Sequence, residues 1–212
     1  HDEFFRYKYD KLYSEKSNLR RQVADFVEAQ AGNSELKKEI DLLRQWNGET
    51  TKDNRSAALV LLTFRPRSNS SKRKTGHERT LEQLERASEN LVKHFDQIDV
   101  EWGKVNRLVR GDKNLPLGGG PDTLRAIYGR PQEDGTLAGQ AGDCFFQFVE
   151  WDKDGQLNAW AMNQFGSSPG NPGSLHHTDQ APLFAEEKLR KVPFTREEVL
   201  GNAKQTYRPS ER

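Results

Sequence analysis

The uneven distribution of glycine and proline along the chain constrains its fold more than any other feature of the sequence. Residues 1–101 contain only 3 of the 17 glycines and 1 of the 9 prolines, whereas residues 102–212 contain the other 14 and 8. Both residue types interrupt helices and favour turns. We therefore predict an α+β chain with a helical segment over residues 1–101 and a segment of loops and strands over residues 102–212.

Hydrophobic spacing and capping residues predict three amphipathic helices in the first segment. Ser17 is placed to cap a helix that ends near Gly32, and Ser34 to begin a second one. Thr80, with Gln83 three residues later, matches a capping box and predicts the start of a third. The apolar positions are Leu19, Val23, Phe26 and Val27 in the first, Leu36, Ile40 and Leu43 in the second, and Leu81, Leu84, Leu91, Phe95 and Ile98 in the third.

Residues 57–64, with the sequence AALVLLTF, are apolar in every direction and are followed by Pro66. A helix of this composition has no polar face to turn toward water. We therefore expect it to be buried on all sides.

The second segment contains one clear β-hairpin. Residues 144–151 (CFFQFVEW) and 157–165 predict its strands, and residues 152–155 (DKDG) predict its turn. Both strands carry apolar side chains on both faces, which is typical of a sheet covered on both sides. Residues 115–122 (LPLGGGPD) form a glycine-rich turn, but the Gly-Lys-Ser/Thr of a phosphate-binding loop does not follow it.

Composition excludes several classes of protein and indicates a small core. Only 45 of the 212 residues are Leu, Ile, Val or Phe, close to the ~20% below which chains rarely bury a core. We therefore expect much of the apolar surface to pack against other chains. A net charge of +1 argues against a general nucleic-acid binder, and the sequence has no run of 18 apolar residues that would span a membrane. The lone Cys144 excludes an intrachain disulfide.

Two short polar stretches invite a functional interpretation, and for each we favour a simpler one. Residues 65–74 carry five cations without an interleaved aromatic, so a solvated loop fits better than a nucleic-acid patch. His176 and His177, followed by Asp179, resemble metal ligands. Adjacent residues point apart on a strand and no third ligand has suitable spacing, so hydrogen bonding within a loop fits better. We predict no metal site in this chain.

A series of segments in fixed order resembles the C-terminal part of the penicillin acylase family, which belongs to the N-terminal-nucleophile hydrolases. The series spans almost the whole chain, and residues 67–75 match least. The glycine-rich run is most similar to the branch that holds acyl-homoserine-lactone acylases and lipopeptide acylases. The matching segments are DEFFRYKYD at 2–10, LRQWNG at 43–48, WGKVNRL at 102–108, GD at 111–112, LPLGGGPDTLR at 115–125, GD at 142–143, FVEW at 148–151, QFGSS at 164–168 and SLHHTDQAPLF at 174–184.

The resemblance implies an amide hydrolase that is made as one precursor and cut into an α chain and a β chain. The nucleophile is then the first serine of the β chain, whose own α-amine acts as the base. By length this chain corresponds to about the last two-fifths of a β chain, so that the nucleophile, a nearby histidine and an oxyanion asparagine all lie upstream of His1. The implied fold is the C-terminal portion of a four-layer αββα sandwich.

Further expectations about partners and location follow from the same resemblance. The partners are the α chain and the N-terminal part of the β chain, and the substrate is a small N-acyl compound; neither nucleic acid nor membrane is expected as a partner. No cofactor is expected in this chain, although a structural calcium elsewhere in the enzyme fits the family. The family is exported, so we expect a periplasmic or secreted enzyme. A chain that begins at His1, without a signal-peptide pattern, is expected to be a processed piece of a precursor or, alternatively, an artificially trimmed chain.

Glu150 is the one candidate catalytic residue within this chain. In the glutaryl and cephalosporin acylase branch a late glutamate is proposed to support the active-site histidine, and Glu150 occupies the matching position. It shares a strand face with Phe146 and Phe148, so we expect its carboxylate to be largely out of water and in need of a partner. The alternative is that Glu150 only ends a strand beside the turn.

Two other functions remain open at this point. Within the enzyme interpretation, the chain could belong to a β-lactam acylase, because the acyl pocket that decides the substrate lies upstream. Outside it, the chain could be a non-enzymatic helical interaction module with a small β appendage, which would fold and persist alone.

Overall fold

A computed structural model describes residues 2–64, 76–203, 206 and 208 of the chain. The chain divides into two compact units, Asp2–Asp143 and Cys144–Arg212. This division does not coincide with the boundary near Trp102 at which the composition changes. The basic stretch within residues 65–75 lies outside the described residues.

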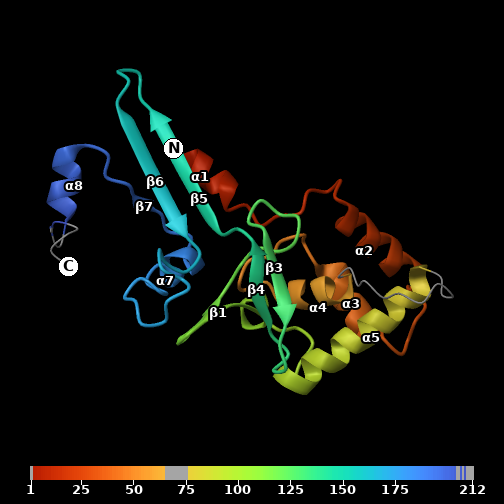
Figure 1. Ribbon diagram of the computed structural model, residues 1–212. Coiled ribbons are helices and arrows are strands. Elements are labelled where there is room, and N and C mark those ends of the chain that lie inside the picture. Colours follow the sequence, from red (N-terminus) through yellow and green to blue (C-terminus); the bar gives the residue numbers. More distant parts are fainter. Residues whose placement is uncertain (1, 65–75, 204–205, 207, 209–212) are drawn as a thin grey trace. The chain divides into compact units, whose positions relative to one another are not determined.

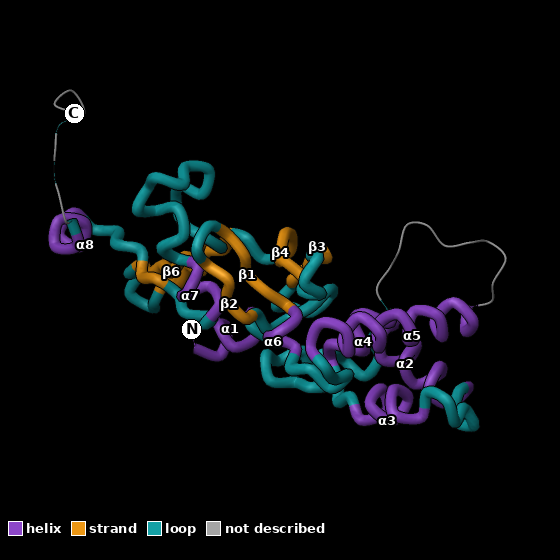
Figure 2. The backbone as a smooth tube through the Cα atoms, turned by 90° about the horizontal axis from the view of Figure 1, so that it is seen from below, coloured by secondary structure: helices purple, strands orange, loops and turns teal. Residues whose placement is uncertain are grey.

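The first unit begins with helices and continues with a sheet (Figure 1). The four helices α2, α3, α4 and α5 pack against one another around a common apolar core. Figure 2, seen from below, shows α2, α3, α4 and α5 gathered in one bundle. The helices of this unit are α1 (Asp2–Lys8), α2 (Asn18–Ala29), α3 (Lys37–Gln45), α4 (Ala57–Thr63), α5 (Gly76–Phe95) and α6 (Trp102–Val105).

One of the three predicted helix starts is confirmed. Ser17 caps α2, with its side chain accepting a hydrogen bond from the backbone N–H of Arg20. The other two are wrong. Asn33, not Ser34, accepts from the N–H groups of the turn that precedes α3. Thr80 lies inside α5, where its hydroxyl donates to the Gly76 carbonyl, because a threonine hydroxyl can bond the preceding turn as well as cap a helix.

The buried apolar helix predicted over residues 57–64 is confirmed as α4. Every residue from Ala57 to Leu61 is buried, as is Thr63. The side chains around α4 include Phe26 of α2, Leu43 of α3 and Leu84 of α5, each 1% exposed or less. The helix is therefore the centre of the bundle, which explains why it needs no polar face.

The sheet of the first unit has four strands in the order β2-β1-β4-β3. Strands β1 and β4 pair in parallel, whereas the outer pairs are antiparallel. The strands are β1 (Asn106–Arg110), β2 (Lys113–Pro116), β3 (Ile127–Pro131) and β4 (Leu137–Gly142). Leu108, Ile127 and Leu137 turn into the unit and are nearly fully buried.

The glycine-rich run between β2 and β3 is a tightly packed internal loop. Gly119 has a φ of +89°, and a Cβ there would lie 2.3 Å from the Arg125 carbonyl oxygen, so no other residue fits without a shift. The Gly119 carbonyl accepts a 2.7 Å hydrogen bond from the indole N–H of Trp102. The backbone of this loop is therefore packed closely against Arg125 and Trp102.

The second unit contains the predicted β-hairpin. Strands β5 (Phe145–Trp151) and β6 (Leu157–Asn163) pair antiparallel over their full length, and β7 (Arg190–Lys191) adds to the other side of β6. Asp152 shapes the turn, its carboxylate accepting from the N–H groups of Asp154 and Gln156. Two short helices follow the hairpin, α7 (Ala181–Ala185) and α8 (Arg196–Asn202). Among the described residues, no helix combines the length and apolar character needed to cross a bilayer.

Candidate functional site

Glu150 lies near the end of β5, opposite Asn158 of β6. Its side chain shares a face with Phe146 and Phe148, as the alternation of a strand predicts. The rings of Phe146 and Phe148 meet edge to face with their centroids 5.9 Å apart. The sequence therefore placed Glu150 on the correct face of the strand.

That face is covered unevenly. Helix α7 packs against β6, and its Phe184 ring lies 6.4 Å from that of Phe146. Phe148 is 8% exposed, and Met162, which pairs with Phe146 across the hairpin, is fully buried. Glu150 lies two residues beyond Phe148 and is half-buried. The expectation that its carboxylate is largely out of water therefore stays a prediction, because this chain buries Glu150 only partly and α7 contacts the opposite end of the strand.

The other face of β5 is open to solvent and, apart from Gln147, apolar. Phe145 is 55% exposed, Val149 41% and Trp151 65%. Strand β5 is also the outer strand of its sheet, in the order β5-β6-β7, so one side of its backbone pairs with no strand of the described residues. Large apolar side chains beside an unpaired strand edge are typical of a surface that another polypeptide covers. Within the described residues of the second unit, this face of β5 is therefore not covered as the sequence predicts.

The histidines of the second unit take part in a hydrogen-bonded loop. His176 Nδ1 lies 2.9 Å from Asp179 Oδ2, and the His176 carbonyl accepts from the Ser168 N–H. The His177 Nδ1 atom is buried and has no hydrogen-bond partner among the described residues. Within those residues no group of three or more His, Cys, Asp or Glu side chains is placed to hold a metal ion.

A buried charge cluster lies in the first unit, and sequence reasoning missed it. Arg125, whose side chain is 1% exposed, pairs with Asp143 at 3.0 Å, and Lys8 reaches the same carboxylate at 2.7 Å. The Arg125 guanidinium also lies 5.5 Å from the centre of the Tyr9 ring. The Asp143 carboxylate thus connects α1, the loop after β2 and the end of β4, three parts of the chain that are distant in sequence.

The residues of this cluster all fall in segments that carry the family resemblance, yet nothing in their spacing pointed to contact. Lys8 and Asp143 are 135 positions apart, and each is one of many charged residues. The only local signal is Gly142, which has a φ of +99° and whose Cβ would lie 2.2 Å from the Ala126 carbonyl oxygen. Such a glycine indicates a close backbone approach, but it does not name the charged partners.

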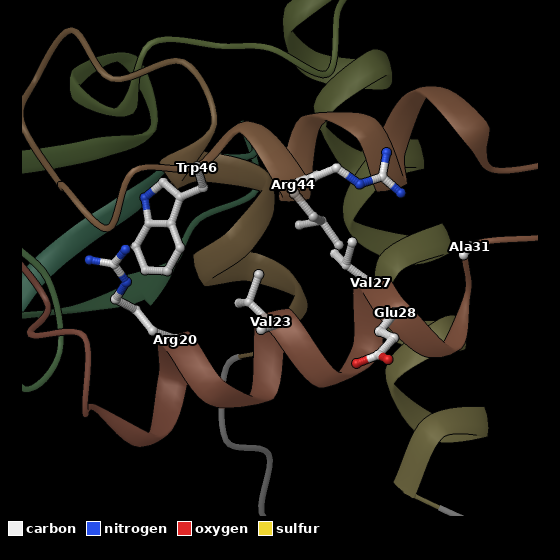
Figure 3. A pocket seen from close by; sticks show the side chains of 9 residues that line it. Arg20, Val23, Val27, Glu28, Ala31, Arg44 and Trp46 are labelled. Atoms are coloured by element: carbon white, nitrogen blue, oxygen red, sulfur yellow. The ribbon is translucent and has the colours of Figure 1, made fainter.

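A groove of about 470 Å³ runs between α2 and α3 in the first unit (Figure 3). Its floor is apolar and includes Val23 and Val27. Arg20 and Arg44 flank it, and both are already engaged: Arg20 donates to the Tyr13 carbonyl, and Arg44 pairs with Asp41. The groove therefore presents packing surface and no arrangement of reactive groups.

Comparisons with known proteins identify the relatives of this chain. The family model described as penicillin amidase matches residues 2–201. The acyl-homoserine lactone acylase PvdQ of Pseudomonas fluorescens Pf-5 is 31% identical over 104 residues, which are 48% of this chain and 13% of that protein. PvdQ of strain Pf0-1 is 33% identical over 101 residues, or 46% of this chain and 13% of that protein. The matched region therefore makes up only about an eighth of the length of these relatives.

Among solved structures, a thermostable penicillin G acylase from Alcaligenes faecalis aligns with 98% of this chain and 48% of its own chain. The sequence identity is 12% and the TM-score 0.45, so we infer nothing about function from this likeness.

Proposed function

The chain belongs to the penicillin amidase family, and we propose from this that it is the C-terminal part of the β chain of an N-acyl amide hydrolase. The observation that carries the proposal is the family match over residues 2–201. The order of the matching segments along the chain, from residue 2 to residue 184, supports the same assignment. In the proposed enzyme this chain completes a four-layer αββα sandwich with other parts of the precursor.

The proposed reaction is attack on an amide carbonyl by the N-terminal serine of the β chain, located on another chain. Its α-amine takes the hydroxyl proton, and backbone amides with an asparagine stabilise the oxyanion. The α-amine then gives this proton to the leaving amine, and the acyl group stays on the serine oxygen. Water attacks the ester with the same α-amine as base, and the acid leaves as the proton returns to the serine oxygen. This chemistry requires no cofactor from the present chain; a structural calcium would lie elsewhere in the enzyme.

We propose N-acyl-homoserine lactones or related N-acyl compounds as the substrate class. The two relatives are acyl-homoserine lactone acylases by name, which supports this choice over a β-lactam. The glycine-rich run at residues 115–125 supports it as well, because its sequence most resembles that branch. Export to the periplasm or the medium belongs to the same proposal and is checked by the presence of a signal peptide in the precursor gene.

The partners proposed for this chain are the α chain and the N-terminal part of the β chain. The open edge of β5 and the exposed side chains of Phe145, Val149 and Trp151 support this proposal. A neighbouring strand from the rest of the enzyme would satisfy the backbone groups of β5 and cover the apolar face. It would also complete the burial of Glu150.

The activity is tested on the enzyme assembled from all chains of its precursor. Release of free amine from a long-chain N-acyl-homoserine lactone should exceed release from penicillin G by roughly tenfold or more in kcat/KM, within the range that an acyl pocket provides. The reverse preference would assign a β-lactam acylase instead. No hydrolysis of either amide would contradict the proposed function and favour an interaction module.

We further propose that Glu150 is a positioning residue that orients the active-site histidine of another chain. A carboxylate bonded to an imidazole fixes the tautomer and the orientation of the ring. In the assembled enzyme, Glu150→Gln should lower kcat by roughly ten- to a thousandfold and shift the acidic limb of the pH–rate profile. Glu197→Gln, a substitution of the same kind on the exposed surface of α8, serves as the matched control. Activity within about twofold of the parent would assign Glu150 a purely structural role.

A further inference from the structure

The first unit contains a second cavity, of about 460 Å³, that plays no part in the proposed function. It lies where residues of α2 and α4 approach strands β3 and β4. Its interior is apolar and includes the side chains of Leu61, Ile127 and Leu137, each 7% exposed or less. A cavity of this size, lined mainly by apolar and aromatic side chains with a few polar groups, has the general form of a small-molecule site.

Four aromatic rings line this cavity: Tyr13, Phe64, Trp102 and Tyr128. Tyr13 and Trp102 are deeply buried, at 4% and 1% exposure, whereas Tyr128 is 42% exposed and stands at the opening. The face of an aromatic ring carries negative electrostatic potential because of its quadrupole. Several rings around one space therefore favour a positive charge within it.

Asp122 provides the only formal charge on the described lining of the cavity. Its carboxylate accepts a 2.8 Å hydrogen bond from the Tyr128 hydroxyl, which fixes the acid beside a ring of the opening. The Asp122 backbone has a φ of +63°, a left-handed conformation uncommon for residues other than glycine. No Lys, Arg or His of the described residues lines the cavity to compensate this carboxylate.

The Tyr13 hydroxyl lies beside the residue that precedes Asp122 in the chain. Its pKa is raised, first by burial and then by the charge of Asp122. Tyr13 therefore stays protonated, and its hydroxyl donates to the Pro121 carbonyl beside Asp122. Tyr13 thus adds no negative charge to the wall of the cavity at neutral pH.

We propose that this cavity binds an organic cation, an amine or quaternary ammonium group joined to an apolar body. The apolar part occupies the interior, and the cationic head lies among the aromatic rings near the Asp122 carboxylate. Cation–π attraction and a single countercharge are the interactions that recognise such groups in aromatic cages. The proposal rests on the first unit alone and does not depend on amide hydrolysis.

The test compares two ligands of the same shape that differ in charge. Choline and 3,3-dimethyl-1-butanol share a branched head and a hydroxyethyl tail, but only choline is cationic. In calorimetric titrations of the full protein with all of its chains, choline should bind roughly tenfold more tightly than the alcohol. Equal affinity of the two probes, or no binding of either, would overturn the proposal.

Substitutions then locate the site. Asp122→Asn removes the charge, yet asparagine tolerates a positive φ and still accepts from the Tyr128 hydroxyl, so the fold should persist while choline affinity falls about fivefold. Tyr128→Leu removes a ring and should also weaken binding, whereas Tyr128→Phe keeps the ring and should retain most of it. Asp112→Asn, which neutralises an exposed carboxylate in the turn between β1 and β2, is the control.

Two results with the variants would contradict the site even if choline binds. One is an Asp122→Asn protein that binds choline as tightly as the parent. The other is an Asp112→Asn protein that loses as much affinity as Asp122→Asn, which would indicate general electrostatic attraction in place of a cage.

Discussion

The two units of the chain bury their apolar residues to very different degrees. In Asp2–Asp143 a continuous core runs from Tyr13 to Leu137, with α4 at its centre. Among the described residues of Cys144–Arg212 the buried group is small and lies around Phe148, Met162 and Phe184, while Trp151 is 65% exposed and Leu175 91%. Both units expose some large apolar side chains, among them Phe4 and Leu124 in the first, but the first unit encloses an extensive core and the second a small one.

The comparison shows that the stability of a unit on its own depends on how completely its apolar side chains are enclosed, as well as on how many it has. Burial of apolar surface contributes roughly 25 cal/mol per Å², so an aromatic side chain exposed on β5 contributes little until something covers it. Domains below ~70–80 residues rarely gain enough from a single core to be stable alone. The second unit is of this size and depends on a covering partner in the proposed enzyme.

The largest expected effect comes from separating the units. Residues 2–143 expressed alone should unfold in one cooperative transition, because their core and the Arg125–Asp143 pair are internal to them. Residues 144–212 expressed alone should show no cooperative transition and should bind a hydrophobic dye. Circular dichroism during thermal unfolding distinguishes the two behaviours. Cooperative unfolding of residues 144–212 would remove the contrast between the units.

A smaller effect is expected from Asp143→Asn in the first unit. The substitution leaves Arg125 buried without its countercharge, which typically costs about 3–5 kcal/mol of unfolding free energy. Asp41→Asn is the matched control, since Asp41 pairs with Lys37 and Arg44 on the surface, and its unfolding midpoint in urea should stay near that of the parent. Equal loss from the two substitutions would mean that the buried cluster does not hold the first unit together.

The smallest expected effect is the dependence of the first unit's unfolding free energy on alkaline pH. The pKa of Tyr13 is raised in the folded chain, mainly by burial, whereas an unfolded tyrosine ionises near pH 10. Its contribution to stability is therefore full below about pH 10 and is lost as pH rises further, by up to ~1.4 kcal/mol per pH unit. Tyr13→Phe keeps the ring and should flatten this alkaline slope in urea unfolding of the first unit. An unchanged slope would assign the loss to other groups.

The sequence predicted the elements whose signal is local. Ser17, the apolar run of α4 and the turn at residues 152–155 each specify their structure within a few residues, and all three were found as predicted. The start of α3 was misplaced because the neighbouring Asn33 accepts from the backbone N–H groups that Ser34 was expected to cap. The start of α5 was misplaced because the Thr80 hydroxyl bonds the preceding turn and does not cap the helix. A capping pattern indicates that a helix is present more reliably than it indicates the residue at which the helix begins.

The parts that depend on distant contacts could not be predicted in this way. The carboxylate of Asp143 contacts Lys8 and Arg125 only in the folded unit. The cavity at Asp122 is lined by residues that are more than 100 positions apart in the sequence. Glu150 was placed on the correct face because strand alternation is local, whereas its degree of burial depends on where α7 lies. Its proposed role depends further on residues of another chain.

The most direct measurement of the central claim is amide hydrogen exchange along β5, in this chain alone and in the enzyme assembled from all of its chains. We predict that β1 and β4 of the first unit are protected in both samples. The amides of Phe145–Trp151 that point away from β6 should exchange rapidly in the isolated chain and become protected in the assembled enzyme. Equal exchange of these amides in the two samples would contradict the account, because it would show that no partner strand completes the second unit.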